Sequence, residues 1–249
     1  MGTFQLAEDA SLNTIAFKIN SNHEMVSFYK DVLGFTLKNE ENGLSIFDIN
    51  KDKKQQLILE ETDAMDLSEK AEASLVHYSV QMGSESEFTA ALQHFSSQDI
   101  STEELSKNKK LNGVRLVDPE KNEIEFLYPN KAHDGQNGET VGSGLVKISL
   151  NTANKEQSQT FYENIFGMKK LAEDLLTFNN QKVVFQLVEE KDYDNLGWSF
   201  FVVDLKTSEE IERLSEHLKT MKQDFFVDNK RSILTVFDVN GIEWWFVRE

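Results

Sequence analysis

Motifs of the common hydrolytic sites are absent from this chain. None of its 249 residues is cysteine, which excludes disulfides, thiolate zinc sites, iron–sulfur clusters and cysteine nucleophiles. The sequence contains no His-Glu-x-x-His motif of zinc proteinases, and neither the Asp-Thr-Gly nor the Asp-Ser-Gly triplet of aspartic proteinases. Peptide hydrolysis therefore has no support from a cysteine, zinc or aspartic motif.

Serine chemistry has little more support. The Gly-x-Ser-x-Gly motif of a nucleophile elbow is absent, and its nearest counterpart, GSG at residues 142–144, lies in a glycine-rich connector. Ser-x-x-Lys occurs at 27–30 in a predicted core helix and at 106–109 in a predicted loop. Because triads are recognised by geometry and not by chain order, a serine, a histidine and an acid brought together only by folding stay open.

Alternating strands place a smaller set of polar side chains on shared faces. In segments 14–19 and 75–81, apolar residues alternate with polar ones, so each strand has one face for a helix and one polar face. With the strand 123–128, these polar faces carry Thr14, His77, Ser79, Gln81 and Glu125. Each of these strands is therefore predicted to turn a polar face away from its helix, and His77 and Glu125 are candidates to hydrogen-bond each other.

An internal repeat divides the chain into two halves. The phrase FYKDVLGF at residues 28–35 returns as FYENIFGM at residues 161–168. The apolar residues of both copies fall at helical spacing, and Gly34 and Gly167 stand where a helix takes a left-handed C-terminal cap. The two halves are therefore expected to share one architecture.

Each half is predicted to contain two modules of strand, helix and small meander. The modules span residues 12–62 and 74–129 in the first half, and 145–190 and 197–248 in the second. Ser84 with Glu87, and Thr207 with Glu210, predict capping boxes at two of the helices. Residues 131–144 hold four glycines and almost no apolar residue, which is typical of a linker. We predict an α+β fold of two tandem domains, residues 1–130 and 145–249, each of two paired βαβββ modules.

Charge narrows the range of partners. The 26 Lys and Arg against 43 Asp and Glu give a formal net charge of −17, which repels nucleic acids and anionic lipid surfaces. No stretch approaches the roughly 18 apolar residues of a membrane span, and the first residues lack a basic segment followed by an apolar run. The expected location is the cytoplasm, with neither nucleic acid nor membrane as a partner.

The strand, the Phe-Tyr-x-x-x-Leu-Gly-Phe helix and the closing Asp-Pro-x-x-Asn-x-Ile-Glu strand resemble the vicinal oxygen chelate superfamily, which includes glyoxalase I, extradiol dioxygenases and bleomycin-resistance proteins. The resemblance covers both halves. It implies paired βαβββ modules whose sheets curl round a cleft, with a divalent metal held by residues on the first and last strands of the modules.

The resemblance also assigns ligand positions, and most of them carry unsuitable residues. They fall on Thr14 in the first module, His77 and Glu125 in the second, Lys147 in the third, and Ser199 and Trp245 in the fourth. Only His77 and Glu125 match, so a metal site needs a third ligand such as Glu60. Two donors alone make a weak site, and the simpler interpretation is a polar cleft without a metal or other cofactor.

The arrangement of two such domains, with the endings EIEF at 123–126 and EWWF at 243–246, is most similar to the streptococcal CppA family. That resemblance implies a proteinase that degrades the third complement component, which would then be the partner. The alternative is a metal-poor protein that binds a small ligand or a protein partner. A lyase or dioxygenase with a metal on His77 and Glu125 is a third interpretation. For Trp245, filling of a cavity competes with stacking on a planar ligand.

Overall fold

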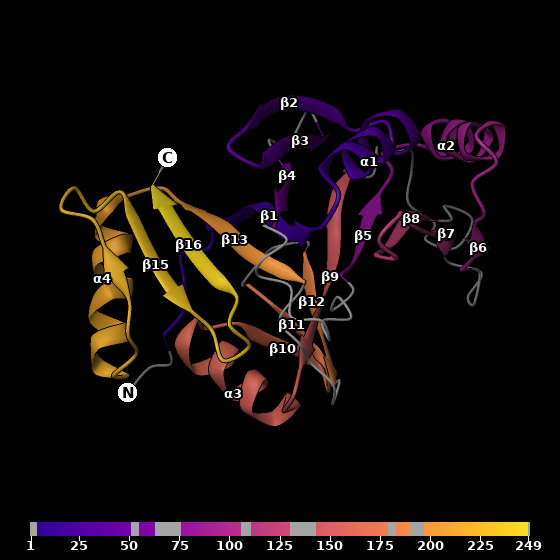
Figure 1. Cartoon of the computed structure of the whole chain (residues 1–249). Helices are drawn as coiled ribbons and strands as arrows, with labels where there is room; N and C mark the ends of the chain where they lie inside the picture. Colours follow the sequence, from indigo (N-terminus) through magenta and orange to yellow (C-terminus); the bar gives the residue numbers. More distant parts are fainter. Residues whose placement is uncertain are drawn as a thin grey trace. The chain divides into compact units, whose positions relative to one another are not determined.

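The computed structural model describes residues 4–50, 55–62, 76–105, 111–129, 143–178, 183–189 and 197–248. Within these ranges the strands form two eight-stranded mixed sheets accompanied by few helices, which confirms the predicted α+β class (Figure 1). Most of the predicted linker, and the Ser-x-x-Lys segment at 106–109, lie outside the described residues. Across the described part, every helix is too short or too polar to cross a membrane.

Two compact units divide the described residues, and they do not follow chain order. One, which we call the N-terminal unit, contains residues 19–62 and 76–148 apart from the gaps given above. The other, the C-terminal unit, contains residues 4–18 and 149–248 with the same exception. The strand at the start of the chain therefore belongs to the unit formed mainly by the second half.

The N-terminal unit has two groups of strands. In chain order its first group is α1 (Asn22–Ser27), a π-helical turn η1 (Phe28–Val32), β2 (Thr36–Glu41), β3 (Leu44–Asn50) and β4 (Gln55–Glu61). Its second group is β5 (His77–Gln81), α2 (Glu85–Ser97), β6 (Glu103–Glu104), β7 (Leu111–Val117) and β8 (Glu123–Pro129). Strands β2, β3 and β4 pair antiparallel, whereas β5 pairs parallel to β8, which continues antiparallel to β7 and β6.

The C-terminal unit repeats this order. It contains β1 (Ser11–Ile19), α3 (Lys155–Ile165), β10 (Lys169–Ala172), β11 (Leu175–Thr177), β12 (Val184–Glu189), β13 (Trp198–Leu205), α4 (Ser208–Thr220), β14 (Phe226–Val227), β15 (Ile233–Phe237) and β16 (Glu243–Arg248). Strand β9 (Gly144–Thr152) is shared between the units, since its residues up to Ile148 belong to the N-terminal one. Strand β13 pairs antiparallel to β1 and parallel to β16, and β16 continues to β15 and β14.

The repeated Phe-Tyr phrase is explained by a buried hydrogen bond in each unit. Tyr29 donates its hydroxyl to Asp118 Oδ2 at 3.1 Å, and Tyr162 donates to Asp238 Oδ2 at 2.7 Å. Each aspartate opens the turn before a closing strand, where it also accepts backbone N–H groups of that turn. The phrase therefore ties the helix of one module to the last hairpin of the next.

Burial sets the acidity of these aspartates. It raises the pKa of Asp118 to about 6, although hydrogen bonds from Asn122, Tyr29 and Glu120 oppose the shift. Burial also raises the pKa of Asp238, against hydrogen bonds from Tyr162, Trp244 and the turn backbone. Both carboxylates are thus structural groups that need every donor around them.

Helix ends follow the sequence signals closely. Gly34 has φ +74° and Gly167 has φ +66°, the left-handed conformations predicted for them. A second reason requires glycine at position 167: the Cβ of any other residue would lie 2.4 Å from the Phe4 carbonyl oxygen. Thr207 and Glu210 form the predicted capping box, whereas the Glu87 carboxylate accepts from Gly83 N and only Ser84 caps its helix.

The core of the C-terminal unit is an aromatic cluster. Trp244 is fully buried and packs against the rings of Phe166 at 5.0 Å and Phe201 at 4.8 Å. Phe246 is fully buried as well and lies 5.5 Å from Phe166. Trp244 and Phe246 thus lie on the core face of β16, two residues apart as the alternation of a strand requires.

We expect Tyr29→Phe and Tyr162→Phe each to lower the free energy of unfolding by about 1–3 kcal/mol, because each leaves a buried aspartate one donor short. Urea denaturation followed by tryptophan fluorescence and circular dichroism measures the loss. Tyr128→Phe is the matched control, since Tyr128 is also buried, against Phe88, and loss of its hydroxyl leaves both tyrosine–aspartate bonds in place. Equal losses in all three variants would contradict the assigned role of the tyrosine–aspartate bond.

Candidate functional site

The polar side chains of the N-terminal unit gather on one face of β5, β8 and β7. In the register of these strands, Glu125 lies between Ser79 on β5 and Arg115 on β7. The neighbouring row places His77 beside Glu123. Because side chains two residues apart share a face of a strand, these five residues point to the same side of the sheet.

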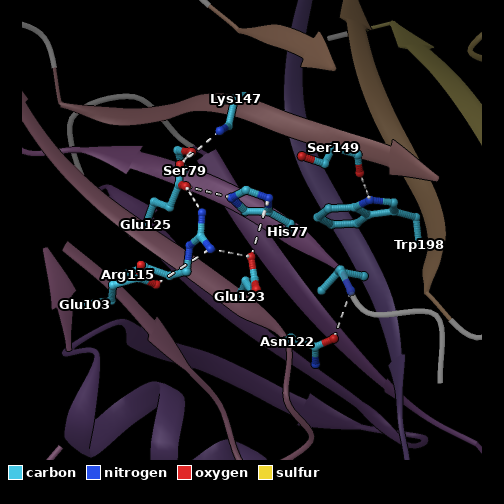
Figure 2. Close-up of polar contacts among 11 residues, drawn as sticks. His77, Ser79, Glu103, Arg115, Asn122, Glu123, Glu125, Lys147, Ser149 and Trp198 are labelled. Atoms are coloured by element: carbon cyan, nitrogen blue, oxygen red, sulfur yellow. Dashed lines mark hydrogen bonds and ion pairs between the residues drawn. The ribbon is translucent and has the colours of Figure 1, made fainter. Parts of the chain in front are cut away.

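Glu125 is the centre of this cluster, and both its carboxylate oxygens are occupied (Figure 2). Its Oε2 accepts from the Ser79 hydroxyl at 2.6 Å and lies 3.0 Å from the ammonium of Lys147, which comes from β9. Its Oε1 lies 3.1 Å from His77 Nε2 and accepts from Arg115 Nη2 at 3.2 Å. Only 6% of the Glu125 side chain is exposed, so four donors satisfy a nearly buried charge. We call these five residues the Glu125 cluster.

This environment keeps Glu125 ionised. Burial alone would raise its pKa, but hydrogen bonds from His77 and Ser79, the charge of His77 and the hydrogen bond from Lys147 outweigh it and hold the pKa well below the ordinary value. A carboxylate with so low a pKa is a poor proton acceptor at neutral pH. Glu125 is therefore suited to holding cationic side chains in place and not to general base catalysis.

Further carboxylates flank Arg115. Its Nη1 lies 3.5 Å from Glu123 and 3.9 Å from Glu103, whose side chain is 71% exposed. Glu123 also lies 3.8 Å from His77 Nδ1. Arg115 Nε is buried and has no hydrogen-bond partner among the described residues. Cationic and anionic groups thus alternate along the cluster, and Arg115 keeps unused donor capacity.

The cluster does not have the arrangement of a serine hydrolase. Ser79 is fully buried, and its hydroxyl donates a hydrogen bond to Glu125. In a catalytic triad the serine hydrogen-bonds the histidine, and the acid lies behind that histidine. Here the acid stands between the serine and His77, so the imidazole is not placed to activate Ser79.

The donor set does not fit the metal of the superfamily. His77 and Glu125, two predicted ligands, do lie together, but the ammonium of Lys147 and the guanidinium of Arg115 occupy the same carboxylate. Glu60 is half-buried on β4. No group of three or more His, Asp or Glu suited to a metal occurs in the part of the chain that the structure describes. A dication would have to displace two fixed positive charges.

The ligand positions predicted in the C-terminal unit lie among other kinds of residue. Thr14 is buried on β1, where its hydroxyl donates to Asn13. Trp245 stacks on Phe200 with ring centroids 5.0 Å apart and planes 19° from parallel. Ser199 lies where the register between β13 and β1 shifts. These positions carry hydroxyl and indole groups where the N-terminal unit has an imidazole and a carboxylate.

Arg115 and Glu123 are not among the residues that the sequence predicts for the site, and Ser79 is predicted only to lie on a polar face. The sequence does contain a signal for Arg115 and Glu123. The turn at 118–122 joins β7 to β8, and counting outward from it pairs Val117 with Glu123 and Arg115 with Glu125, as the structure shows. Turn geometry fixes the register of a hairpin, so a charge pair two residues further out was predictable.

We expect Glu125→Gln to lower the free energy of unfolding by about 1–3 kcal/mol at pH 7, because it removes the charge that the buried donors were arranged around. The loss should depend on pH. Since folding lowers the Glu125 pKa, the stabilisation is complete above its ordinary pKa near 4.5 and is lost as the pH falls below that value.

Denaturation curves of both proteins between pH 7 and pH 3 measure the difference, with Glu41→Gln at an exposed position of β2 as the control. A difference that stays constant, or grows on acidification, would contradict this account.

Comparisons with known proteins agree with this architecture. A family model described as CppA N-terminal matches residues 12–70, and one described as CppA C-terminal matches residues 144–246. No match was found among the curated proteins.

Two solved structures show the same fold. The chain is similar to the cppA protein from Streptococcus pneumoniae, with 16% identity, a TM-score of 0.64 and 100% of both chains covered. It is also similar to glyoxalase I from Zea mays, with 13% identity, a TM-score of 0.67, and 96% of this chain and 92% of that chain covered. Identities this low show the fold alone, which is the tandem glyoxalase-like fold of the vicinal oxygen chelate superfamily. Because the two family models together match more than half of it, the chain belongs to the CppA family.

Proposed function

We propose that the chain is a small-molecule-binding protein whose site is the Glu125 cluster and works without a metal. The observation that carries the proposal is the occupancy of the Glu125 carboxylate by Ser79, His77, Arg115 and Lys147. In a protein of this fold that holds a metal ion, the ion supplies a strong positive charge at the site. Here that charge comes from the protein's own ammonium and guanidinium groups.

The hydrogen-bond donors that the cluster leaves unused define the kind of ligand that it can bind. Glu125 has no free acceptor position, whereas the Lys147 ammonium has three N–H groups and, among the described residues, one ion pair, with Glu125. Lys147 and Arg115 are 27% and 30% exposed, so water or a ligand reaches them. The cluster therefore offers donors, and the ligand it suits carries acceptor oxygens such as a carbonyl or a carboxylate.

Degradation of the third complement component is the activity that the family resemblance implies. No contact in the Glu125 cluster favours it, because Ser79 is buried and bonded to the acid. Ligand binding is the better-supported function, and a protein partner such as complement is a matter for direct experiment.

A thermal-shift screen tests the binding proposal. We expect at least one small carboxylic acid or amide to raise the melting temperature of the wild type equally with and without a chelator, by mass action on the folded state. The same compound should not stabilise Lys147→Met, which loses the ammonium. Glu41→Gln should respond like the wild type. Stabilisation that disappears in chelator would contradict the proposal, and so would a complete set of acids and amides without effect.

Incubation with the intact third complement component tests the alternative. We expect the chain, purified through two unrelated chromatographic steps, to leave this substrate uncut on a gel, because no activated nucleophile lies in the cluster. Cleavage that follows the protein through both steps, turns over more than once and is lost in Glu125→Gln would overturn the binding function in favour of proteolysis.

A further inference from the structure

The ligand position on β9 carries a lysine, and its surroundings give that lysine a specific role. We infer that the ammonium of Lys147 is the resident cation of this site, and that a lysine in place of a third ligand is the main reason why a divalent metal stays out. The inference rests on the proposed metal-independent site, and it extends that proposal by naming the residue that makes it so.

Lys147 lies at a predicted ligand position. The resemblance assigns ligand positions to His77 and Glu125 in the second module and to Lys147 in the third. The structure brings these three side chains together, since His77 Nε2 lies 3.1 Å from Glu125 Oε1 and Lys147 Nζ lies 3.0 Å from Glu125 Oε2 (Figure 2). Lys147 therefore stands in the place of a third ligand and carries a donor that cannot ligate.

The charge of Lys147 also opposes a metal ion. A metal ion requires lone pairs, and the ammonium supplies none while it occupies Oε2 of the carboxylate that a metal would use. It also repels a dication at short range in a site where Glu125 is nearly buried and screening is weak. Lys147 thus excludes a metal in two ways: its ammonium has no lone pair with which to ligate the metal, and its positive charge repels the dication.

Variants of Arg115 distinguish the missing ligand from the added charge. Its guanidinium contacts the same carboxylate, 3.2 Å from Oε1, but it comes from β7, where the resemblance assigns no ligand. Removing the Arg115 charge should therefore weaken the repulsion without creating a ligand set. Replacing Lys147 by a ligating residue should do both, which makes Arg115→Met and Lys147→Met matched controls.

The test is a metal titration of the full chain after treatment with a chelator. Ni²⁺ and Zn²⁺ are added to the wild type and to Lys147→His, and binding is measured by calorimetry and by competition with a chromophoric chelator. We expect Lys147→His to bind one metal ion per chain at least about 100-fold more tightly than the wild type, because it gains one imidazole ligand and loses one cation. Lys147→Met and Arg115→Met, which lose a cation without gaining a ligand, should bind the metal far more weakly than Lys147→His.

Two further variants assign the bound metal to this cluster. Adding His77→Ala to Lys147→His should abolish the gain, since two donors are then left. Lys147→Glu supplies a carboxylate in place of the imidazole and should also bind one metal, with a melting temperature that rises when the metal is added. This second donor keeps the test valid if Lys147→His does not fold.

Two results would overturn the inference. One is a wild type that binds one metal as tightly as Lys147→His and loses it in His77→Ala, which would also remove the proposed metal-independent function. The other is the absence of any gain in both donor variants when circular dichroism shows them folded. That second result leaves the thermal-shift test of ligand binding untouched, so failure of the inference and failure of the proposed function are distinguishable.

Discussion

The buried bond between a tyrosine hydroxyl and an aspartate is the interaction on which the rest of this structure depends. It occurs as Tyr29–Asp118 in one unit and as Tyr162–Asp238 in the other. In each unit, the tyrosine lies on the helix of the first module, and the aspartate lies in the turn before the last strand of the second module. That last strand is β8 in the N-terminal unit and β16 in the C-terminal unit. Because β8 carries Glu125, the position of the charged cluster follows from the seating of this turn. A desolvated aspartate persists only with a full set of donors, which makes the arrangement cooperative.

The two units share one fold but carry different residues on the polar faces of their strands. In the N-terminal unit, β5 and β8 carry an imidazole, carboxylates and a hydroxyl, and a lysine and an arginine complete the charge balance. At comparable positions of the C-terminal unit, Trp245 stacks on Phe200 and Thr14 bonds its own neighbour. The difference shows that the modules require only an alternating pattern, while the residues of the polar face are free to serve a site or simply to pack.

Glu125 illustrates how a satisfied buried charge constrains chemistry. Four donors and a low pKa make it an unreactive anchor, in contrast to the carboxylates of hydrolytic sites, whose pKa values are raised by burial without such partners. Its contribution is to orient Lys147 and Arg115. Specificity in such a site comes from the donors that remain, because Glu125 has no acceptor position left to offer a ligand.

The sequence by itself determined the repeat, the alternation of the strands, the left-handed Gly34 and Gly167, and the order of strand and helix in each module. These features depend on local periodicity and backbone preference, which a single chain displays directly. It also placed His77 and Glu125 on polar faces.

Only the tertiary structure decided that Lys147 joins these two residues. Lys147 lies 22 residues beyond Glu125, past residues 130–142, and it reaches the same carboxylate through β9. The first strand, likewise, pairs with β13 near the other end of the chain. Contacts of this kind depend on how distant strands align, and neither periodicity nor spacing encodes that alignment.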